Sequence, residues 1–227
     1  MKFALIDNIR TEATKGAKGL CPICGSDVIS KCGDVKLHHW AHKSIRNCDP
    51  WWENETEWHR EWKNNFNSDW QEIILRDEVS GEKHIADVQT SYGLVIEFQH
   101  SHIDPIERSS REQFYKKMFW VVDGTRLKRD YPRFIAAKGN FRLTNKKGYF
   151  VVDSPHKCFP SSWVDSSCPV IFDFKGNEEI KYAYDERYPL YCLLPKINEM
   201  QSIVIISSRE SLIKIIISGE IFAMGGK

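Results

Sequence analysis

The spacing of apolar residues changes several times along the chain, and each spacing predicts a different element. Aromatic residues at every fourth position, Trp58, Trp62 and Phe66, indicate an amphipathic helix over residues 53–66. Shorter apolar runs follow, bounded by the turn residues that are typical of strand ends. The order predicted is strands at 71–79, 83–90 and 94–100, a helix from 105 to about 117 and a buried strand at 118–122.

Beyond residue 126 the pattern indicates mainly strands. A hairpin is predicted from residues 141–144 and 149–153, with a glycine at position 148 in its turn. Further strands are predicted at 169–174, 180–184, 189–194 and 202–206, and a final helix at 208–218. This part contains no catalytic motif, so we assign it to substrate or partner binding by elimination.

The loop at residues 91–93 has a glycine where a left-handed residue is needed, which is typical of a hairpin. In that register the numbers of paired residues sum to 184, so Asp87 lies opposite Glu97. Directly opposed residues have Cβ atoms about 4.5–5.5 Å apart. Alternation along each strand then places Gln89 and Gln99 on the same face as the two carboxylates.

Two carboxylates this close repel each other, so a divalent metal ion between Asp87 and Glu97 is the simplest explanation of the pair. The alternative is an exposed hairpin that tolerates its acids. On the preceding helix, Glu55, His59 and Lys63 recur every fourth residue beside the aromatic stripe. They indicate either a surface ladder of ion pairs or a catalytic face.

The second predicted helix begins with Asp104 as N-cap and Pro105 at its first position. Arg108, Arg111 and Tyr115 share one face of this helix. Because a guanidinium group can bind phosphate through two hydrogen bonds, this face predicts a phosphate-binding surface.

Four of the seven cysteines lie within the first 48 residues, among several histidines. In a cytosolic chain such clustering indicates a metal site rather than disulfides. Cys21 and Cys24 enclose a tight turn that ends in Gly25, and both thiolates of such a knuckle can bind one zinc ion.

A tetrahedral zinc site needs a second pair of ligands, which we predict to be His42 and Cys48. His39 can replace either of these, and Cys32 is a weaker candidate. Because so short a segment has little core, a structural zinc ion would supply much of its folding free energy.

The distribution of charge adds to this picture. The net charge of +1 on 227 residues arises because acidic and basic segments of the chain cancel each other. Residues 49–107 carry 14 acidic and 4 basic side chains, whereas residues 108–148 carry 3 acidic and 12 basic ones. Carboxylates hold divalent cations and basic groups hold phosphates, so the segregation favours a metal-dependent enzyme that acts on a polyanion. Solvated faces of alternating sign are the alternative.

The sequence predicts neither a membrane-spanning segment nor a signal peptide. The longest apolar stretch, near the end of the chain, is interrupted by charges and is too short to span a bilayer. The first residues lack the apolar region of a signal peptide. We therefore expect a cytoplasmic protein.

Six short motifs occur in one order between residues 15 and 125. They are Cys-Pro-x-Cys-Gly at 21–25, His-Trp-Ala-His at 39–42, Glu-Thr-x-x-His-x-x-x-Lys at 55–63, Ala-Asp-Val at 86–88, Glu-Phe-Gln-x-Ser-x-Ile at 97–103 and Arg-x-x-x-Tyr at 111–115. In these motifs the chain resembles the competence protein CoiA-like family, which is similar to the PD-(D/E)xK nucleases. The resemblance implies a restriction-endonuclease-like core of helix, three strands, helix and fourth strand.

The resemblance also implies roles for individual residues. Asp87 and Glu97 would bind the catalytic Mg²⁺ or Mn²⁺, and Gln99 stands where most of these nucleases have a lysine. Glu55 matches the acid of their first helix, and His59 would lie near the site. Without a lysine at position 99, catalysis would rely more on the metal or on a neighbour: His59, Lys63 or Lys83.

On the second helix, Arg111 and Tyr115 match positions expected to face substrate, and we place Lys63 and Arg108 with them. The predicted fold is α/β with a mixed sheet. It comprises a zinc module at 1–50, a nuclease core at 51–130 and a β-rich region with a terminal helix at 131–227.

The expected function is metal-dependent hydrolysis of DNA, in bacterial DNA processing, recombination or anti-phage defence, with a partner protein in such a system. The alternative is a catalytically inactive DNA-binding accessory protein of recombination or competence. Gln99 is the residue that favours this alternative.

Overall fold

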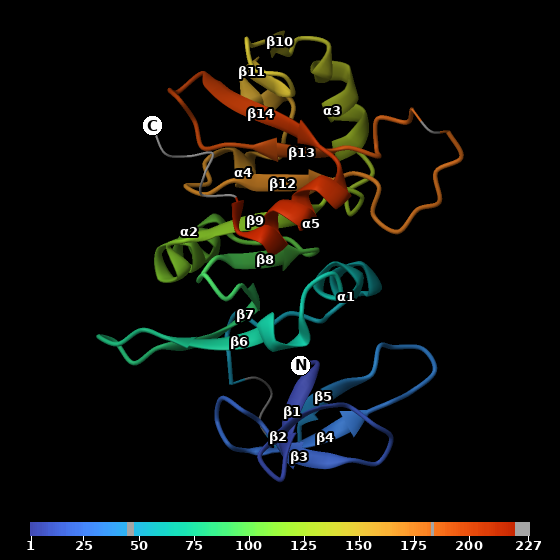
Figure 1. Ribbon diagram of the computed structural model, residues 1–227, viewed down its shortest axis with the longest axis vertical. Helices are drawn as coiled ribbons and strands as arrows, with labels where there is room; N and C mark the ends of the chain where they lie inside the picture. The colour runs from blue at the N-terminus through green and yellow to red at the C-terminus, as the bar shows by residue number, and fades with distance from the viewer. Residues whose placement is uncertain (45–47, 183, 221–227) are drawn as a thin grey trace. The chain divides into compact units, whose positions relative to one another are not determined.

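The computed structural model describes residues 1–44, 48–182 and 184–220 (Figure 1). The chain divides into two compact units, which we call the first unit, residues 1–89, and the second unit, residues 90–227. Each unit contains helices and strands, so the protein is a mixed α/β protein rich in β structure, as predicted. The predicted boundaries at residues 50 and 130 remain predictions.

The first unit begins with a five-stranded antiparallel sheet in the order β2-β1-β3-β4-β5. Its core contains Ala4, Val28 and Trp40, and the Trp40 indole donates a hydrogen bond of 2.9 Å to the Thr11 carbonyl. The sequence pattern did not predict these strands, because each is too short to show a clear alternation. They are β1 Phe3–Ile6, β2 Ile9–Glu12, β3 Lys18–Leu20, β4 Asp27–Lys31 and β5 His39–His42.

The predicted first helix is α1, Glu57–Lys63, and it is shorter than the pattern indicated. Thr56 is its N-cap, since the Thr56 hydroxyl accepts a hydrogen bond from the His59 amide. The predicted aromatic stripe is confirmed, because all three of its residues are buried. Glu55, however, lies before the helix rather than within it.

Two antiparallel strands follow in the first unit, β6 at Gln71–Arg76 and β7 at Lys83–Gln89. Along β7, His84, Ala86 and Val88 are buried while the residues between them are more exposed. This alternation confirms the predicted strand, and it places Asp87 on the more exposed face.

The described residues of the second unit form seven strands in the order β10-β11-β14-β13-β12-β9-β8. The β8–β9 and β9–β12 pairs are parallel, whereas the four other pairs are antiparallel. In chain order the strands are β8 Val95–Gln99, β9 Met118–Asp123, β10 Arg142–Leu143, β11 Tyr149–Asp153, β12 Val170–Asp173, β13 Leu190–Leu193 and β14 Gln201–Ser207.

Four α-helices accompany these strands: α2 Pro105–Tyr115, α3 Asp130–Lys138, α4 Ser161–Val164 and α5 Arg209–Ser218. Phe134 of α3 packs against Phe174 and Tyr191, with ring centroids 4.7 and 4.4 Å away. Trp163 of α4 packs against Trp120 of β9, 5.3 Å away. These aromatic contacts form much of the core of the second unit. Short 3₁₀ helices lie at Ser68–Trp70 in the first unit and Pro155–Lys157 in the second.

Two predictions in the second unit differ from the structure. The predicted strand at 180–184 is wrong, because its described residues form a loop in which the Tyr184 side chain is 98% exposed. Helix α3 was not predicted, since Pro132 in its first turn reads as a helix breaker, although proline is tolerated there.

The loop predicted between the strands at 83–90 and 94–100 has the expected turn. The Thr90 amide donates to the Leu94 carbonyl at 2.9 Å, and Gly93 has a φ of +79°. Thr90 and Leu94 are thus paired, and their numbers sum to 184 as the predicted register requires.

Within the described ranges, no helix combines the length and the hydropathy that crossing a bilayer requires.

Candidate functional site

A cluster of four potential metal ligands lies at one end of the N-terminal sheet. The ligand atoms of Cys21, Cys24, His42 and Cys48 all lie within 4.8 Å of one another. Two of the separations are 3.6 Å between the sulfurs of Cys21 and Cys48, and 3.4 Å between Cys24 Sγ and His42 Nε2. A tetrahedral zinc ion with bonds of about 2.0–2.3 Å separates its ligands by roughly 3.5–3.8 Å, so the cluster can hold zinc.

Local backbone structure explains how these side chains converge. Between β3 and β4 the chain makes a tight turn, in which the Gly25 amide donates to the Cys21 carbonyl at 2.9 Å. Gly25 has a φ of +71°, as the predicted knuckle requires. Strand β5 pairs with β4 so that His42 lies opposite Val28, close to the knuckle.

The two alternative ligands lie outside the cluster. His39 Nδ1 is 2.8 Å from the Leu37 carbonyl, and the Cys32 sulfur is 3.5 Å from the Ala13 carbonyl. Of the open alternatives for completing the site, the structure therefore brings His42 and Cys48 to the knuckle.

The cysteines of the cluster differ in acidity. Burial by itself would raise the pKa of Cys24, but hydrogen bonds with Ser26 and His42 lower that pKa to about 6. Burial and the adjacent Cys21 thiol raise the pKa of Cys48. A divalent cation would favour the thiolate form of all three cysteines.

We predict that the purified protein contains one zinc ion per chain and that His42→Ala lowers this content to near zero. His39→Ala is the matched control and should keep its zinc, because His39 lies outside the cluster. Elemental analysis of both variants measures the effect. Equal zinc content in the two variants would show that His42 is not a ligand.

Asp49, the residue directly after Cys48, binds strand β7. Its carboxylate is buried and lies 2.9 Å from His84 Nδ1, and it accepts hydrogen bonds of 2.9 Å from the Ile85 and Trp51 amides. The Trp51 ring stacks on the His84 ring with centroids 3.2 Å apart. The segment that carries Cys48, a candidate zinc ligand, and the strand that carries Asp87 are therefore joined through one buried carboxylate.

We expect Asp49→Ala to lower the free energy of unfolding, because it leaves buried amide and imidazole groups without their acceptor. An unsatisfied buried donor costs roughly 1–3 kcal/mol. Asp49→Asn keeps one carbonyl acceptor and should lose less. Urea unfolding of both variants tests the ranking, and equal stability of the alanine variant and wild type would refute this role for Asp49.

A second cluster in the first unit is centred on the ammonium group of Lys63, whose side chain is 2% exposed. Lys63 Nζ lies 2.8 Å from Glu55, 3.0 Å from Glu72 and 4.0 Å from Asp87. Arg60 also binds Glu55. A buried cation is tolerated only when its charge is compensated, and here carboxylates from three segments of the chain compensate it.

His59 completes the side of this cluster that includes Asp87. His59 Nε2 lies 2.8 Å from Asp87 Oδ1, and the Asp87 side chain is 19% exposed, against 11% for Glu55 and 10% for Glu72. Glu55, His59, Lys63 and Asp87 were all predicted to belong to one site, and the structure brings them together within the first unit.

The cluster changes the acidity of its members. Burial would raise the pKa of Glu55 and of Glu72, but Lys63 nearby holds the pKa of each carboxyl below its usual value. Burial would lower the pKa of Lys63, but Glu72, Glu55 and Asp87 raise it above its usual value. All three groups are therefore charged over a wide range of pH.

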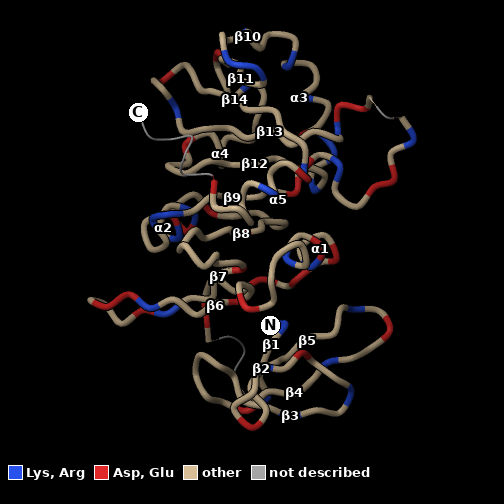
Figure 2. The backbone as a smooth tube through the Cα atoms, in the orientation of Figure 1, with Lys and Arg blue, Asp and Glu red and all other residues tan. Residues whose placement is uncertain are grey.

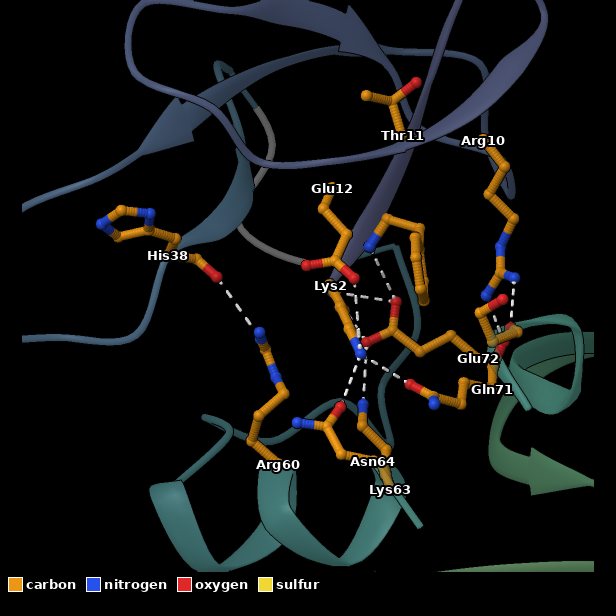
Figure 3. A network of polar contacts seen from close by, with 12 residues as sticks. Lys2, Arg10, Thr11, Glu12, His38, Arg60, Lys63, Asn64, Gln71 and Glu72 are labelled. Atoms are coloured by element: carbon orange, nitrogen blue, oxygen red, sulfur yellow. Dashed lines mark hydrogen bonds and ion pairs between the residues drawn. The ribbon is translucent and has the colours of Figure 1, made fainter. Parts of the chain in front are cut away.

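Glu72 and Lys2 extend the cluster to the N-terminal sheet, as Figure 3 shows. The Glu72 carboxylate accepts hydrogen bonds from the Lys2 and Phe3 amides at 2.7 and 3.1 Å. Lys2 Nζ in turn donates to Asn64 and Gln71, each at 2.8 Å. Glu72 was not predicted as part of the site, although it is an acid directly before the apolar residues of a predicted strand.

The burial of Lys63 corrects its predicted role as a residue that binds substrate. A side chain that is 2% exposed and bound by carboxylates cannot also bind a phosphate from solvent. The i, i+4 spacing correctly predicted that it shares a face with His59, but not that this face is buried.

We predict that Lys63→Met lowers the free energy of unfolding by roughly 3–5 kcal/mol, because it leaves buried carboxylates without their cation. Lys83→Met is the control, since Lys83 is an exposed lysine of β7. Urea unfolding at pH 7 measures both. A loss below 1 kcal/mol for Lys63→Met, or an equal loss for the control, would contradict the assignment.

The same substitution should shift acid unfolding. Because the pKa values of Glu55 and Glu72 are lowered on folding, the stability they contribute is present above their unfolded pKa of about 4.3. It is lost as the pH falls through the lower folded values. Without Lys63, burial raises these pKa values, so unfolding should begin at a higher pH than in wild type.

In the second unit, Glu97 of β8 is buried and paired with Arg111 of α2. Arg111 Nη1 lies 3.2 Å from Glu97 Oε2, and the same guanidinium binds Glu107 through Nε at 3.0 Å. Gln99 is buried as well, and its amide donates to the Ser101 carbonyl at 3.3 Å. The predicted catalytic residues on β8 therefore lie in a compact, ion-paired setting.

Arg108 is likewise buried, and it binds Glu112 at 3.1 Å and the Asp165 carbonyl at 3.1 Å. Glu112 also accepts hydrogen bonds from the Trp120 indole and the Ser166 hydroxyl, at 3.1 and 2.6 Å. These bonds fix α2 against β9 and the segment that follows α4.

The prediction of an exposed phosphate-binding face on α2 is therefore wrong. Arg108, Arg111 and Tyr115 do share one face, but all three are buried. The arginines compensate the buried charges of Glu112 and Glu97 instead of facing solvent.

The chemistry of the Lys63 cluster decides which residues suit a divalent metal ion. Mg²⁺ and Mn²⁺ prefer oxygen ligands, and a catalytic ion also needs access to solvent. Asp87 has the most exposed carboxylate of the cluster and therefore suits such an ion best. Glu55 fits less well, because Lys63 and Arg60 already bind its carboxylate. In the part of the chain that the structure describes, no second group of three or more Cys, His, Asp or Glu side chains converges as the four zinc-ligand candidates do.

Comparison with known families agrees with this N-terminal architecture. Residues 6–50, which include all four members of the Cys and His cluster, match the family model described as "Competence protein CoiA, N-terminal domain". Competence protein CoiA of Bacillus subtilis (strain 168) is 25% identical over 166 residues, which cover 68% of this chain and 43% of that relative. Both matches support the CoiA family. The chain aligns with less than half of the relative's length, and no solved structure matches it.

Proposed function

We propose that this protein is a divalent-metal-dependent nuclease that hydrolyses DNA phosphodiester bonds, with a PD-(D/E)xK-like core. The observation that carries the proposal is the convergence of His59, Lys63 and Glu55 with Asp87. His59 lies 2.8 Å and Lys63 4.0 Å from the Asp87 carboxylate. Carboxylates, a histidine and a lysine in one cluster are the groups that metal-dependent phosphodiester hydrolysis uses.

In the proposed site, Asp87 binds Mg²⁺ or Mn²⁺ together with Glu97. The metal supplies a bound water of lowered pKa and stabilises charge on the scissile phosphate. His59 orients the Asp87 carboxylate through its contact with Oδ1, and the Lys63 ammonium lies 4.0 Å from the same carboxylate. Glu55 holds Lys63 in place rather than binding metal, because two cations already bind Glu55.

The pairing of Asp87 with Glu97 rests on the sequence register. The Thr90 and Leu94 pair at the turn supports this register, because it begins the pairing that sums to 184. The two acids belong to separate compact units, so their juxtaposition stays part of the proposal.

We place the proposed nuclease in bacterial DNA processing, either in competence and recombination or in anti-phage defence, in the cytoplasm and alongside a partner protein. The match of residues 6–50 to the CoiA N-terminal domain supports a setting related to competence.

We expect Asp87→Asn to reduce cleavage of single-stranded, duplex or branched DNA by roughly 100-fold or more with Mg²⁺ or Mn²⁺. Metal stabilisation of the transition state contributes several kcal/mol, which corresponds to such a loss. Glu61→Gln, an exposed residue of the same helix as His59, is the control and should cleave normally. Equal cleavage by wild type and Asp87→Asn, with both variants folded, would overturn the proposal.

One observation favours the alternative of a catalytically inactive DNA-binding accessory protein. Arg111 binds the Glu97 carboxylate at 3.2 Å, and a guanidinium in that position competes with a metal ion for the same oxygens. This alternative predicts salt-dependent DNA binding without turnover in Mg²⁺ or Mn²⁺. Purified wild type that binds DNA but does not cleave any of the three substrates would favour it.

A further inference from the structure

Half of the twelve basic side chains of residues 108–148 form a hydrogen bond or an ion pair within the second unit. Arg108 and Arg111 are buried with carboxylates, and Lys117 donates to the Tyr92 carbonyl at 2.8 Å. The surface cations that form ion pairs are Arg133 with Asp130, Lys138 with Glu186 and Arg142 with Asp153. These partners account for much of the excess positive charge that the sequence shows in this segment.

Of the other six, Lys116, Lys146 and Lys147 are exposed at separate places, and three lie together on one loop. Arg126, Lys128 and Arg129 are exposed and lie between the end of β9 and the start of α3. Figure 2 shows Lys and Arg in blue along the whole backbone, interspersed with Asp and Glu in red. Among the residues that the structure describes, no carboxylate forms an ion pair with any of the three. The next acid along the chain, Asp130, is bound by Arg133 at 2.9 Å, and its charge also interacts with Arg126 and Arg129, so it compensates part of the loop's positive charge.

The start of this loop is held in a defined conformation by the parallel strands. The Asp123 carboxylate accepts hydrogen bonds from the Thr125 amide and hydroxyl at 2.8 and 2.6 Å, and the Gly124 amide donates to the Asp173 carbonyl at 2.9 Å. A Cβ atom on Gly124 would lie 2.5 Å from the Phe174 ring, so only glycine fits there. The three cations therefore follow an anchored turn.

Two histidines at the end of β8 lie beside this loop. His100 and His102 line, with Arg126, a cavity of about 50 Å³ at the carboxyl ends of β8, β9 and β12. His100 is half-exposed, and its Nδ1 lies 2.7 Å from Asp123 Oδ2. The cavity is too small for a nucleobase, so this surface suits phosphate groups that lie across it and not bases inserted into it.

We propose that the loop at 126–129, together with His100 and His102, binds the phosphate backbone of DNA. Three exposed cations outnumber the one nearby acid, Asp130, and form no ion pair among the described residues; on an anchored loop beside two histidines they suit a polyanion that is bound through its phosphate backbone. This surface takes the place of the predicted α2 face, whose arginines are buried. The choice of DNA rests on the proposed function, whereas the binding surface does not depend on catalysis.

The test is charge reversal of the loop in the full chain, Arg126→Glu, Lys128→Glu and Arg129→Glu combined. The matched control is Lys116→Glu, Lys146→Glu and Lys147→Glu, which changes the net charge equally at exposed lysines elsewhere in the second unit. Fluorescence anisotropy measures binding to labelled single-stranded and duplex DNA of about 20 nucleotides, without divalent cations or chelators, from 50 to 200 mM salt. Circular dichroism checks that both variants are folded.

We expect the loop variant to bind DNA at least tenfold more weakly at 50 mM salt. The slope of log affinity against log salt should fall by roughly 2–3, since each lost phosphate contact removes about 0.7–0.9. The control should keep most of its affinity and its slope. Equal losses in both variants, undiminished binding by the loop variant, or wild-type binding to anionic vesicles but not to DNA would each overturn the proposal.

DNA cleavage by the proposed nuclease is tested separately from DNA binding by the loop. Asp87→Asn should bind DNA as tightly as wild type, because Asp87 is not part of the loop surface. If no form cleaves DNA but charge reversal of the loop abolishes binding, the binding surface is supported and the nuclease is not.

Discussion

The ammonium group of Lys63 is the constraint on which the first unit depends. A lysine with almost no exposed surface is stable only if carboxylates surround it, and here they come from the segment before α1, from β6 and from β7. Each carboxylate is also fixed by a second partner: Arg60 for Glu55, the amides of β1 for Glu72 and His59 for Asp87. Compensation of one buried charge therefore sets the positions of α1, β6 and β7 together.

The Cys and His cluster adds a second constraint within the same unit. Its four side chains come from the knuckle, from β5 and from the segment before α1, so a bound zinc ion would fix the ends of a sheet with a small apolar core. Asp49, next to Cys48, then binds the backbone and a histidine of β7. The segment of the Cys and His cluster, through Asp49, and the Lys63 cluster therefore both contact strand β7, which carries Asp87.

The arginines of α2 show how far helical spacing alone can be interpreted. Spacing correctly placed Arg108, Arg111 and Tyr115 on one face, but it contains no information on whether that face is covered. A signal was available in the sequence, because Glu112 lies four residues after Arg108 and Glu107 four residues before Arg111. Arginines with acids at this spacing are compensated within their own helix, whereas Arg126, Lys128 and Arg129 share a single nearby acid, Asp130, which forms its ion pair with Arg133.

The sequence by itself determined most of the local structure: the order of helices and strands from residue 57 to 123, the knuckle, the N-cap of α2, and the turn at Gly93. These depend on periodicity, capping and left-handed glycines, which act over a few residues. Only the tertiary structure decided that His42 and not His39 joins the cysteines, that Glu72 shares Lys63 with Glu55, and that the arginines of α2 are buried. Burial and charge compensation are properties of segments brought together from distant parts of the chain, and local spacing cannot specify them.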